Sequence, residues 1–194
     1  MWHKSGVSPS FKARRPVPPL DESALRELAL RYVGKYATTR AKLCAYLTRK
    51  VRERGWGGQR QPDLEALAAR FAELGYIDDA AYALSKSRAL SGRGYGKRRL
   101  AQQLRHAGVA EEDSRDAFDA ADTEAVTAAL RFAERRRIGP FAAQAHDRPA
   151  REKAIAAMVR AGHDFGLART IVSLNPGTQV DAVNLSESLR FDAA

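Results

Sequence analysis

The chain has 194 residues, of which 44% are hydrophobic and 29% charged, and its formal net charge at pH 7 is +10. This length allows one domain or a few small modules with a real core, and the charge favours an acidic partner: nucleic acid, an anionic membrane or an acidic protein surface. No apolar run is long enough to cross a membrane, and Met1–Leu20 lacks the apolar stretch of a signal peptide. The single cysteine, Cys44, cannot form an internal disulfide, so we expect a cytoplasmic protein.

The sequence of residues 1–76 predicts a basic arm followed by three helices. Residues 1–20 carry four cations, four prolines and no carboxylate, which is typical of a flexible arm. Asp21 resembles a helix N-cap and precedes apolar residues at helical spacing. A second helix is expected after Thr38 or Thr39, and a third after Asp63, with a glycine-rich loop over 55–62 between them. We therefore expect a first three-helix unit over residues 21–76.

The stretch from Gly75 to Gly108 contains two helix starts and a glycine-rich turn. Gly75 can end one helix in the left-handed region, and Asp78 can cap the next, expected over residues 79–90. Glycines at positions 92, 94 and 96 are expected to interrupt that helix. A further helix is expected over residues 97–107, with Leu100 and Leu104 on its apolar face and Gly108 after its end.

Four more helices are expected, over residues 111–120, from about 123 to 139, over 148–161 and over 165–174. A shift of 54 residues places Leu104–Gly108 on Met158–Gly162, and the same shift places Ala117-Phe118 on Ile171-Val172. Internal repetition of this kind favours an extended helical array. We expect further three-helix units over 77–120 and 121–176, and a C-terminal tail over 177–194 that is thinly apolar and frayed.

The order and spacing of elements between Gly75 and Gly108 resemble the central repeat of the RecX family, bacterial regulators of the RecA recombinase. The residues that carry the resemblance are Gly75, Tyr76, Ile77, Asp78, Asp79, Tyr82, Gly96, Leu100, Leu104 and Gly108. The resemblance implies an all-α fold of three tandem three-helix, helix-turn-helix-like repeats that form an elongated curved array.

The same resemblance implies a non-enzymatic, monomeric regulator that uses no cofactor and does not associate with membranes. Its partners would be the RecA filament and single-stranded DNA, contacted directly or through the filament. By occupying the filament groove it would modulate RecA in DNA repair, recombination and the SOS response. The expected direction of this modulation is inhibition. The alternative is a general DNA- or RNA-binding helical module without RecA specificity.

Clustered cations are the candidate binding residues for the filament or for nucleic acid. They are Arg40, Lys42, Arg49, Lys50, Arg93, Lys97, Arg98, Arg99, Arg105, Arg135 and Arg136. Solvated helix faces are the ordinary explanation of such runs. Cations in the first turn of a helix oppose its dipole, however, so a binding role explains Lys97, Arg98 and Arg99 better than a structural role. Trp56, Tyr95 and Phe141 could stack on bases, although core or loop-anchoring roles explain them at least as well.

No catalytic or metal-binding pattern is apparent in the sequence. The glycines before Lys97 lack the spacing, the Ser or Thr and the preceding strand of a phosphate-binding loop. Asp78 and Asp79 are better explained as helix-start residues than as an acid–base pair. The four histidines are scattered, and Cys44 lies among apolar residues, which favours a buried position. We therefore expect neither an enzyme nor a metal site.

Overall fold

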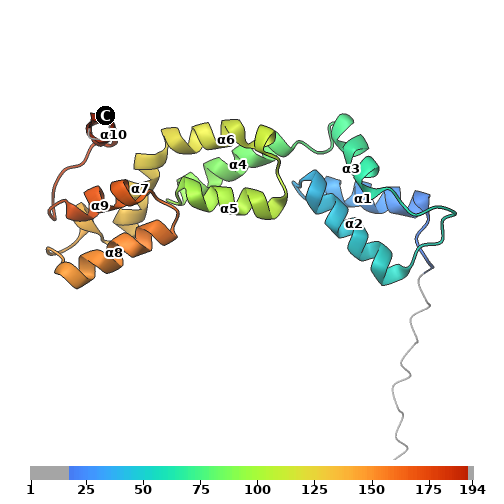
Figure 1. Cartoon of the computed structure of the whole chain (residues 1–194), viewed down its shortest axis with the longest axis horizontal. Coiled ribbons are helices and arrows are strands. Elements are labelled where there is room, and N and C mark those ends of the chain that lie inside the picture. The colour runs from blue at the N-terminus through green and yellow to red at the C-terminus, as the bar shows by residue number, and fades with distance from the viewer. Residues whose placement is uncertain (1–17, 192–194) are drawn as a thin grey trace, which may run out of the picture.

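The computed structural model describes residues 18–191, which form ten α-helices, one short 3-10 helix and one isolated β-bridge between Leu20 and Trp56. The helices fall into three groups that follow one another along the long axis (Figure 1). The first group is α1 (Glu22–Lys35), α2 (Arg40–Arg54) and α3 (Leu64–Glu73), and the second is α4 (Asp79–Gly92), α5 (Lys97–Ala107) and α6 (Glu111–Thr123). The third is α7 (Ala125–Arg136), the 3-10 helix η1 (Gly139–Phe141), α8 (Arg148–Arg160), α9 (Phe165–Ser173) and α10 (Ala182–Phe191).

Side-chain caps fix where most of the helices begin. The carboxylates of Asp21, Asp63 and Asp78 each accept a hydrogen bond from the backbone N–H three residues later, at 2.8 Å. Thr39, rather than Thr38, caps α2. These contacts satisfy N–H groups that a helix leaves unpaired at its first turn, so the predicted helix starts at these four positions are confirmed.

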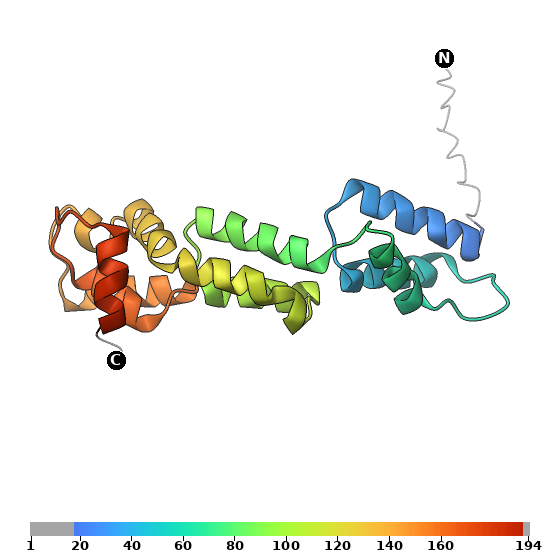
Figure 2. The ribbon, with the colours of Figure 1, turned by 90° about the horizontal axis from the view of Figure 1, so that it is seen from above.

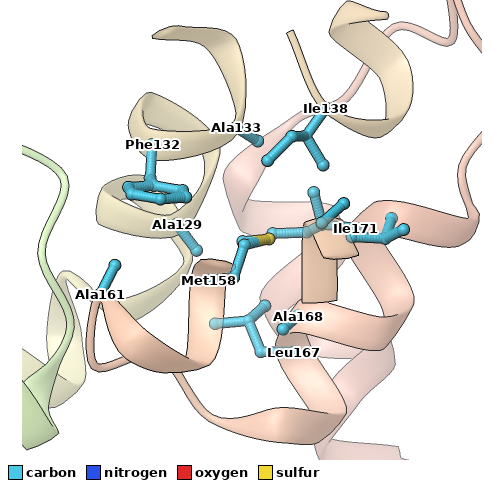
Figure 3. Close-up of a cluster of buried hydrophobic side chains, with 11 residues drawn as sticks. Ala129, Phe132, Ala133, Ile138, Met158, Ala161, Leu167, Ala168 and Ile171 are labelled. Atoms are coloured by element: carbon cyan, nitrogen blue, oxygen red, sulfur yellow. The ribbon is translucent and has the colours of Figure 1, made fainter. Parts of the chain in front are cut away.

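Each group of helices has its own hydrophobic core. The first core surrounds Leu43 and Leu47, and the second surrounds Leu100 and Leu104 on the apolar face expected of α5. The third surrounds Met158 and includes side chains from α7, α8 and α9 (Figure 3). Three separate cores explain why the molecule is elongated rather than globular, and Figure 2 shows α1 and α10 at opposite ends. The expected all-α fold of three-helix units in an elongated array is confirmed.

The 54-residue internal shift corresponds to equivalent positions in the structure. Leu104 and Met158 are both buried in their cores. Gly108 and Gly162 both have positive φ, at 66° and 97°, beyond the ends of α5 and α8. Since only glycine adopts such angles without strain, the same residue type recurs where the same turn recurs.

Several boundaries differ from the sequence-based expectations. Leu20, the last residue of the expected arm, is fully buried in the first core, whereas residues 1–17 of that arm lie outside the described residues. α4 continues through Gly92, where we expected a break, and α6 continues to Thr123. Within the expected tail over 177–194 the structure has α10, and Leu185 of this helix packs against the third core. The unit boundaries at 76 and 120 remain a prediction that the three cores support.

The second helices of the three groups meet end to end. α8, α5 and α2 follow one another along the lower edge of Figure 1. At the joint between the first and second groups, which we call the N-terminal joint, the Thr39 hydroxyl donates a 2.6 Å hydrogen bond to the carbonyl of Ala107. A Cβ on Gly108 would lie 2.3 Å from the Cβ of Ala41, so the two helix ends leave no room for a side chain there.

At the joint between the second and third groups, which we call the C-terminal joint, backbone groups contact each other directly. The backbone N–H of Gly96 donates to the carbonyl of Ala161 at 3.0 Å, and that of Arg98 donates to the carbonyl of Gly162 at 3.1 Å. A Cβ on Gly96 would lie 2.3 Å from the Gly162 oxygen. His163 is buried beside this contact and its Nε2 lies 3.1 Å from the Gly94 carbonyl oxygen. The start of α5 is thus capped by the main chain that follows α8.

Candidate nucleic-acid interface

Two of the candidate cations lie at the N-terminal joint. The Nε of Arg40 donates to Asp79 at 3.1 Å, and its Nη2 donates to Asp113 at 2.6 Å. The hydrogen bond that Arg40 donates to Asp79 is the main reason that the pKa of Arg40 is raised. Lys42 donates to the Tyr82 hydroxyl at 2.5 Å, and its ammonium lies 4.7 Å from the centre of that ring. Both side chains connect the first group of helices to the second.

The three cations at the start of α5 lie beside the C-terminal joint. Lys97 donates to Asp122 and lies over the Phe118 ring, and Arg98 is 3.8 Å from Asp164. Arg99 donates to Gln102 at 3.0 Å. Because α8 ends against α5, the partly negative carbonyl end of α8 lies next to these cations and offsets the unfavourable dipole of α5. The dipole therefore no longer singles out binding as their better explanation.

The remaining candidate cations lie on exposed or half-buried positions of all three groups. Arg49 and Lys50 both reach Glu53, and the hydrogen bond from Lys50 is the main reason that the pKa of Glu53 is lowered. The guanidinium of Arg136 lies 5.8 Å from the centre of the Phe132 ring. The other three, all exposed, are Arg93, Arg105 and Arg135. A binding role for the whole set remains a prediction.

The acidic residues of α6 have two distinct roles in the structure. Asp113 and Asp122 pair with Arg40 and Lys97, so these two carboxylates contact cations that are distant in the sequence. Others in the same helix are exposed, namely Glu111, Glu112, Asp116 and Asp119. This face would repel a phosphate backbone, so any polyanion is expected to bind elsewhere.

The three aromatic residues that the sequence suggested for base stacking pack against the hydrophobic cores. Trp56 packs against the first core and donates its Nε1–H to the carbonyl of Arg60 at 2.6 Å. Tyr95 packs against both the second and third cores, and Phe141 packs against the third. All three are half-buried, which favours the anchoring interpretation that the sequence left open.

Three other aromatic residues, which do not stand out in the sequence, form a cluster with one exposed member, Tyr36. Tyr32 and Tyr46 stack with their ring centres 4.2 Å apart, and Tyr36 extends the pair toward solvent. Lys35, Arg49 and Lys50 lie over these rings. The signal was present in the sequence as tyrosines four residues apart near lysine and arginine, but only the packing of α1 on α2 brings Tyr46 to the other two.

Among residues 18–191 there is no group of three histidine, cysteine or carboxylate side chains that could hold a metal ion. Cys44 is half-buried, its Sγ donates to the carbonyl of Leu64 at 3.4 Å, and burial raises the pKa of its thiol. In the same part of the chain, every helix is too short or too polar to cross a membrane. Asp78 acts as a cap, as expected, whereas Asp79 also binds Arg40.

Comparison with known proteins finds a matching family model and several similar sequences. Residues 78–117 match the family model described as RecX, second three-helix domain. The chain is 35% identical over 175 residues to the regulatory protein RecX of Myxococcus xanthus, an alignment that covers 85% of this chain and 94% of the relative. It is 34% identical over 151 residues to regulatory protein RecX of Thermobifida fusca, covering 76% of each.

Solved structures agree with the fold. A crystal structure of RecX from Lactobacillus salivarius superposes with a TM-score of 0.56 at 20% identity, covering 77% of this chain and 93% of the other. A second crystal structure, of regulatory protein RecX, superposes with a TM-score of 0.55 at 22% identity, covering 77% of this chain and 70% of the other. At these identities the likeness concerns the helical-repeat architecture.

Proposed function

This chain belongs to the RecX family of regulatory proteins, and on that premise we propose that it binds the RecA filament formed on single-stranded DNA and inhibits RecA. By lying in the filament groove it obstructs strand exchange and filament growth. The cellular processes that such inhibition would affect are DNA repair, recombination and the SOS response. The protein acts as a monomer in the cytoplasm, without catalysis and without a cofactor.

The observation that carries the proposal is the repeated end-to-end contact of the second helices. Because Thr39 is hydrogen-bonded to the C-terminal end of α5, and Gly96 to the chain at the C-terminal end of α8, the three groups are held at defined positions along one axis. A partner with a repeating surface, such as a helical filament, can then be contacted by several groups at once. Linked contacts of this kind raise the overall affinity without any single strong site.

Electrostatics supports an acidic partner. The net charge of +10 favours association with a nucleoprotein filament or with DNA. The exposed candidates Arg93, Arg105 and Arg135 have no ion pair within residues 18–191 and are available for such contacts. These contacts are individually weak, so affinity depends on their number.

The direct test is RecA-dependent strand exchange titrated with the protein. We expect substoichiometric protein to depress strand exchange and the ATP hydrolysis that accompanies it. The matched control is the same substoichiometric titration against a strand-annealing reaction that needs no RecA, which should be depressed much less than strand exchange. If excess folded protein leaves strand exchange unchanged, the proposed inhibition is wrong.

The second candidate is binding to DNA or RNA without RecA specificity, which the positive charge also favours. It makes a different prediction: affinity for naked single strands would equal affinity for RecA-coated strands. In both cases affinity for single-stranded DNA should fall with salt, with a log–log slope of roughly −0.7 per neutralised phosphate. The comparison between naked and coated strands therefore separates the two candidates, whereas salt dependence does not.

A further inference from the structure

The surface between α1 and α2 carries three tyrosines arranged as a continuous aromatic platform. The rings of Tyr32 and Tyr46 are nearly parallel, at 16°, with centres 4.2 Å apart. The Tyr36 ring lies 5.3 Å from Tyr32, tilted by 52°, and half of the Tyr36 residue remains exposed. We call Tyr32, Tyr36 and Tyr46 the tyrosine platform. Its inner pair packs the two helices together, and its outer ring is free to contact a ligand.

Cations surround the tyrosine platform. Lys35 lies 5.4 Å from the centre of the Tyr36 ring, and Arg49 and Lys50 lie 5.7 and 5.9 Å from the centre of the Tyr46 ring. Arg31 completes the lining of a hollow of about 540 Å³ beside the rings. This volume falls in the range of small-ligand pockets, about 300–1,000 Å³. Every side chain that lines it is a tyrosine, a lysine or an arginine.

Two carboxylates reduce the positive charge without cancelling it. Glu27 pairs with Arg31 at 2.9 Å, and Glu53 pairs with Lys50 at 2.6 Å and with Arg49 at 3.6 Å. Four cations therefore face two carboxylates around the tyrosine platform. Neither carboxylate lines the hollow, so an anion entering it meets the cationic groups first.

The groove on the other side of α1 has the opposite character. Between α1 and α3 a larger hollow of about 840 Å³ is lined by leucines, by the aromatic residues Trp56, Phe71 and Tyr76, and by both acidic and basic residues. A hollow with apolar lining residues and charges of both signs is suited to binding a segment of another protein. The tyrosine platform, with no aliphatic lining and a positive rim, suits a planar ring attached to an anion.

We propose that the tyrosine platform binds single-stranded nucleic acid, with an unpaired base stacked on Tyr36 and the adjoining phosphates held by Lys35 and Arg49. Aromatic platforms bordered by cations bind single strands in this way because every base has a stacking face and every nucleotide a phosphate. The site goes beyond the proposed function, because it acts on a strand that carries no RecA. It gives the first group of helices a contact of its own with DNA.

The test compares an oligothymidylate with an abasic oligonucleotide of the same length, in the absence of RecA. Both probes carry the same phosphates, but only the first has bases to stack. We expect wild-type protein to bind the oligothymidylate more tightly. Y36L should weaken that binding roughly five- to tenfold and leave abasic binding unchanged, whereas Y36F, which keeps the ring, should bind like wild type. Tyr36 is half-exposed with extended backbone angles, so Y36L should fold normally, as an unchanged melting temperature would verify.

Charge variants test the phosphate contacts separately. K35Q combined with R49Q should weaken both probes equally, since both carry the phosphate backbone. The matched control, R26Q combined with R70Q on the α1–α3 groove, removes the same charge elsewhere and should weaken both probes less.

Three results would overturn the site. Wild-type protein could bind both probes equally, Y36L could weaken both equally, or Y36L could spare both probes and weaken only binding to RecA filaments. The last result would make the tyrosine platform a protein contact instead. None of these results affects the strand-exchange test, so the tyrosine platform and the proposed function fail independently.

Discussion

The two joints of the array hold helix ends together by different chemistry. At the N-terminal joint, side chains make the contacts: the Thr39 hydroxyl reaches the Ala107 carbonyl, and Arg40 reaches Asp79 and Asp113. At the C-terminal joint the main chain makes them, with Gly96 and Gly162 so close that neither tolerates a Cβ. Side-chain hydrogen bonds and ion pairs therefore dominate the N-terminal joint, whereas backbone hydrogen bonds dominate the C-terminal joint.

Both joints also share an electrostatic feature. In each, the carbonyl end of one second helix meets the N–H end of the next, so that partial charges of opposite sign are adjacent. The start of α2 carries Arg40 and Lys42, and the start of α5 carries Lys97, Arg98 and Arg99. Cations are favourable near a helix C-terminus, and the C-terminal ends of α5 and α8 lie next to these helix starts. The neighbouring helix therefore explains the position of the cations as well as a ligand would.

The largest expected effect is at the C-terminal joint. G96A places a methyl group 2.3 Å from the Gly162 oxygen, which must move, and should cost about 2–4 kcal/mol of stability. Hydrogen exchange should locate the loss at the amides of Gly96 and Arg98. G92A is the matched control: its Cβ meets nothing within 4 Å, so stability should rise by about 0.4–1 kcal/mol. Equal effects of the two variants would show that the close contact does not hold the joint.

Breaking the N-terminal joint should cost less. R40A removes the guanidinium from Asp79, whose side chain is 3% exposed, and should cost about 1–3 kcal/mol as measured by chemical denaturation. The backbone N–H of residue 40 still reaches Asp79, which limits the loss. R70A is the control, because Arg70 and Glu73 form an exposed pair whose removal should cost under about 0.5 kcal/mol. A loss in R40A no larger than in R70A would contradict the structural role of Arg40.

Acid should weaken the C-terminal joint selectively. His163 is 2% exposed, and burial lowers its pKa below the ordinary value of about 6.5. The unfolded chain therefore binds a proton at His163 at a higher pH than the folded chain does. Stability contributed by the neutral ring is complete above about pH 6.5 and is lost as pH falls toward the lower folded pKa.

Melting temperatures between pH 8 and 5 should show this loss in wild-type protein and a shallower decline in H163Q. H106Q, which alters an exposed histidine, should follow the wild-type curve. If H163Q and wild type decline in parallel, burial of His163 does not govern the acid response.

The smallest stability effect is expected from the cations at the start of α5. Replacing Lys97, Arg98 and Arg99 together by Gln removes exposed ion pairs with Asp122 and Asp164, and exposed pairs contribute little to stability. Thermal stability should change by less than about 1 kcal/mol, while filament binding should weaken. If the triple variant instead has a much lower melting temperature and binds filaments normally when folded, these side chains serve structure and not binding.

Local features of the fold could be predicted from the sequence, whereas the joints could not. Asp21 and Asp78 cap helices through bonds to residues three positions away, and Leu100 with Leu104 defines an apolar face. The hydrogen bond from Thr39 to Ala107 spans 68 residues, and that from His163 to Gly94 spans 69. Nothing in a local pattern specifies such partners.

The start of α5 shows why part of the candidate site was also beyond sequence reasoning. Its cap is the main chain after α8, which has no side-chain signature. When α5 is considered without α8, its dipole disfavours the cations in its first turn, and a binding role is then the better explanation for them. The tyrosine platform was missed for a related reason, since Tyr46 joins Tyr32 and Tyr36 only when α2 packs on α1.

The central claim is that this chain recognises the RecA filament rather than polyanions in general. The most direct measurement is co-sedimentation with RecA filaments on single-stranded DNA, compared with naked DNA of the same length at the same salt concentration. We predict tighter binding to the filament, retained at salt concentrations that release the protein from naked DNA. Binding to the filament no tighter than to the naked strand would contradict the claim.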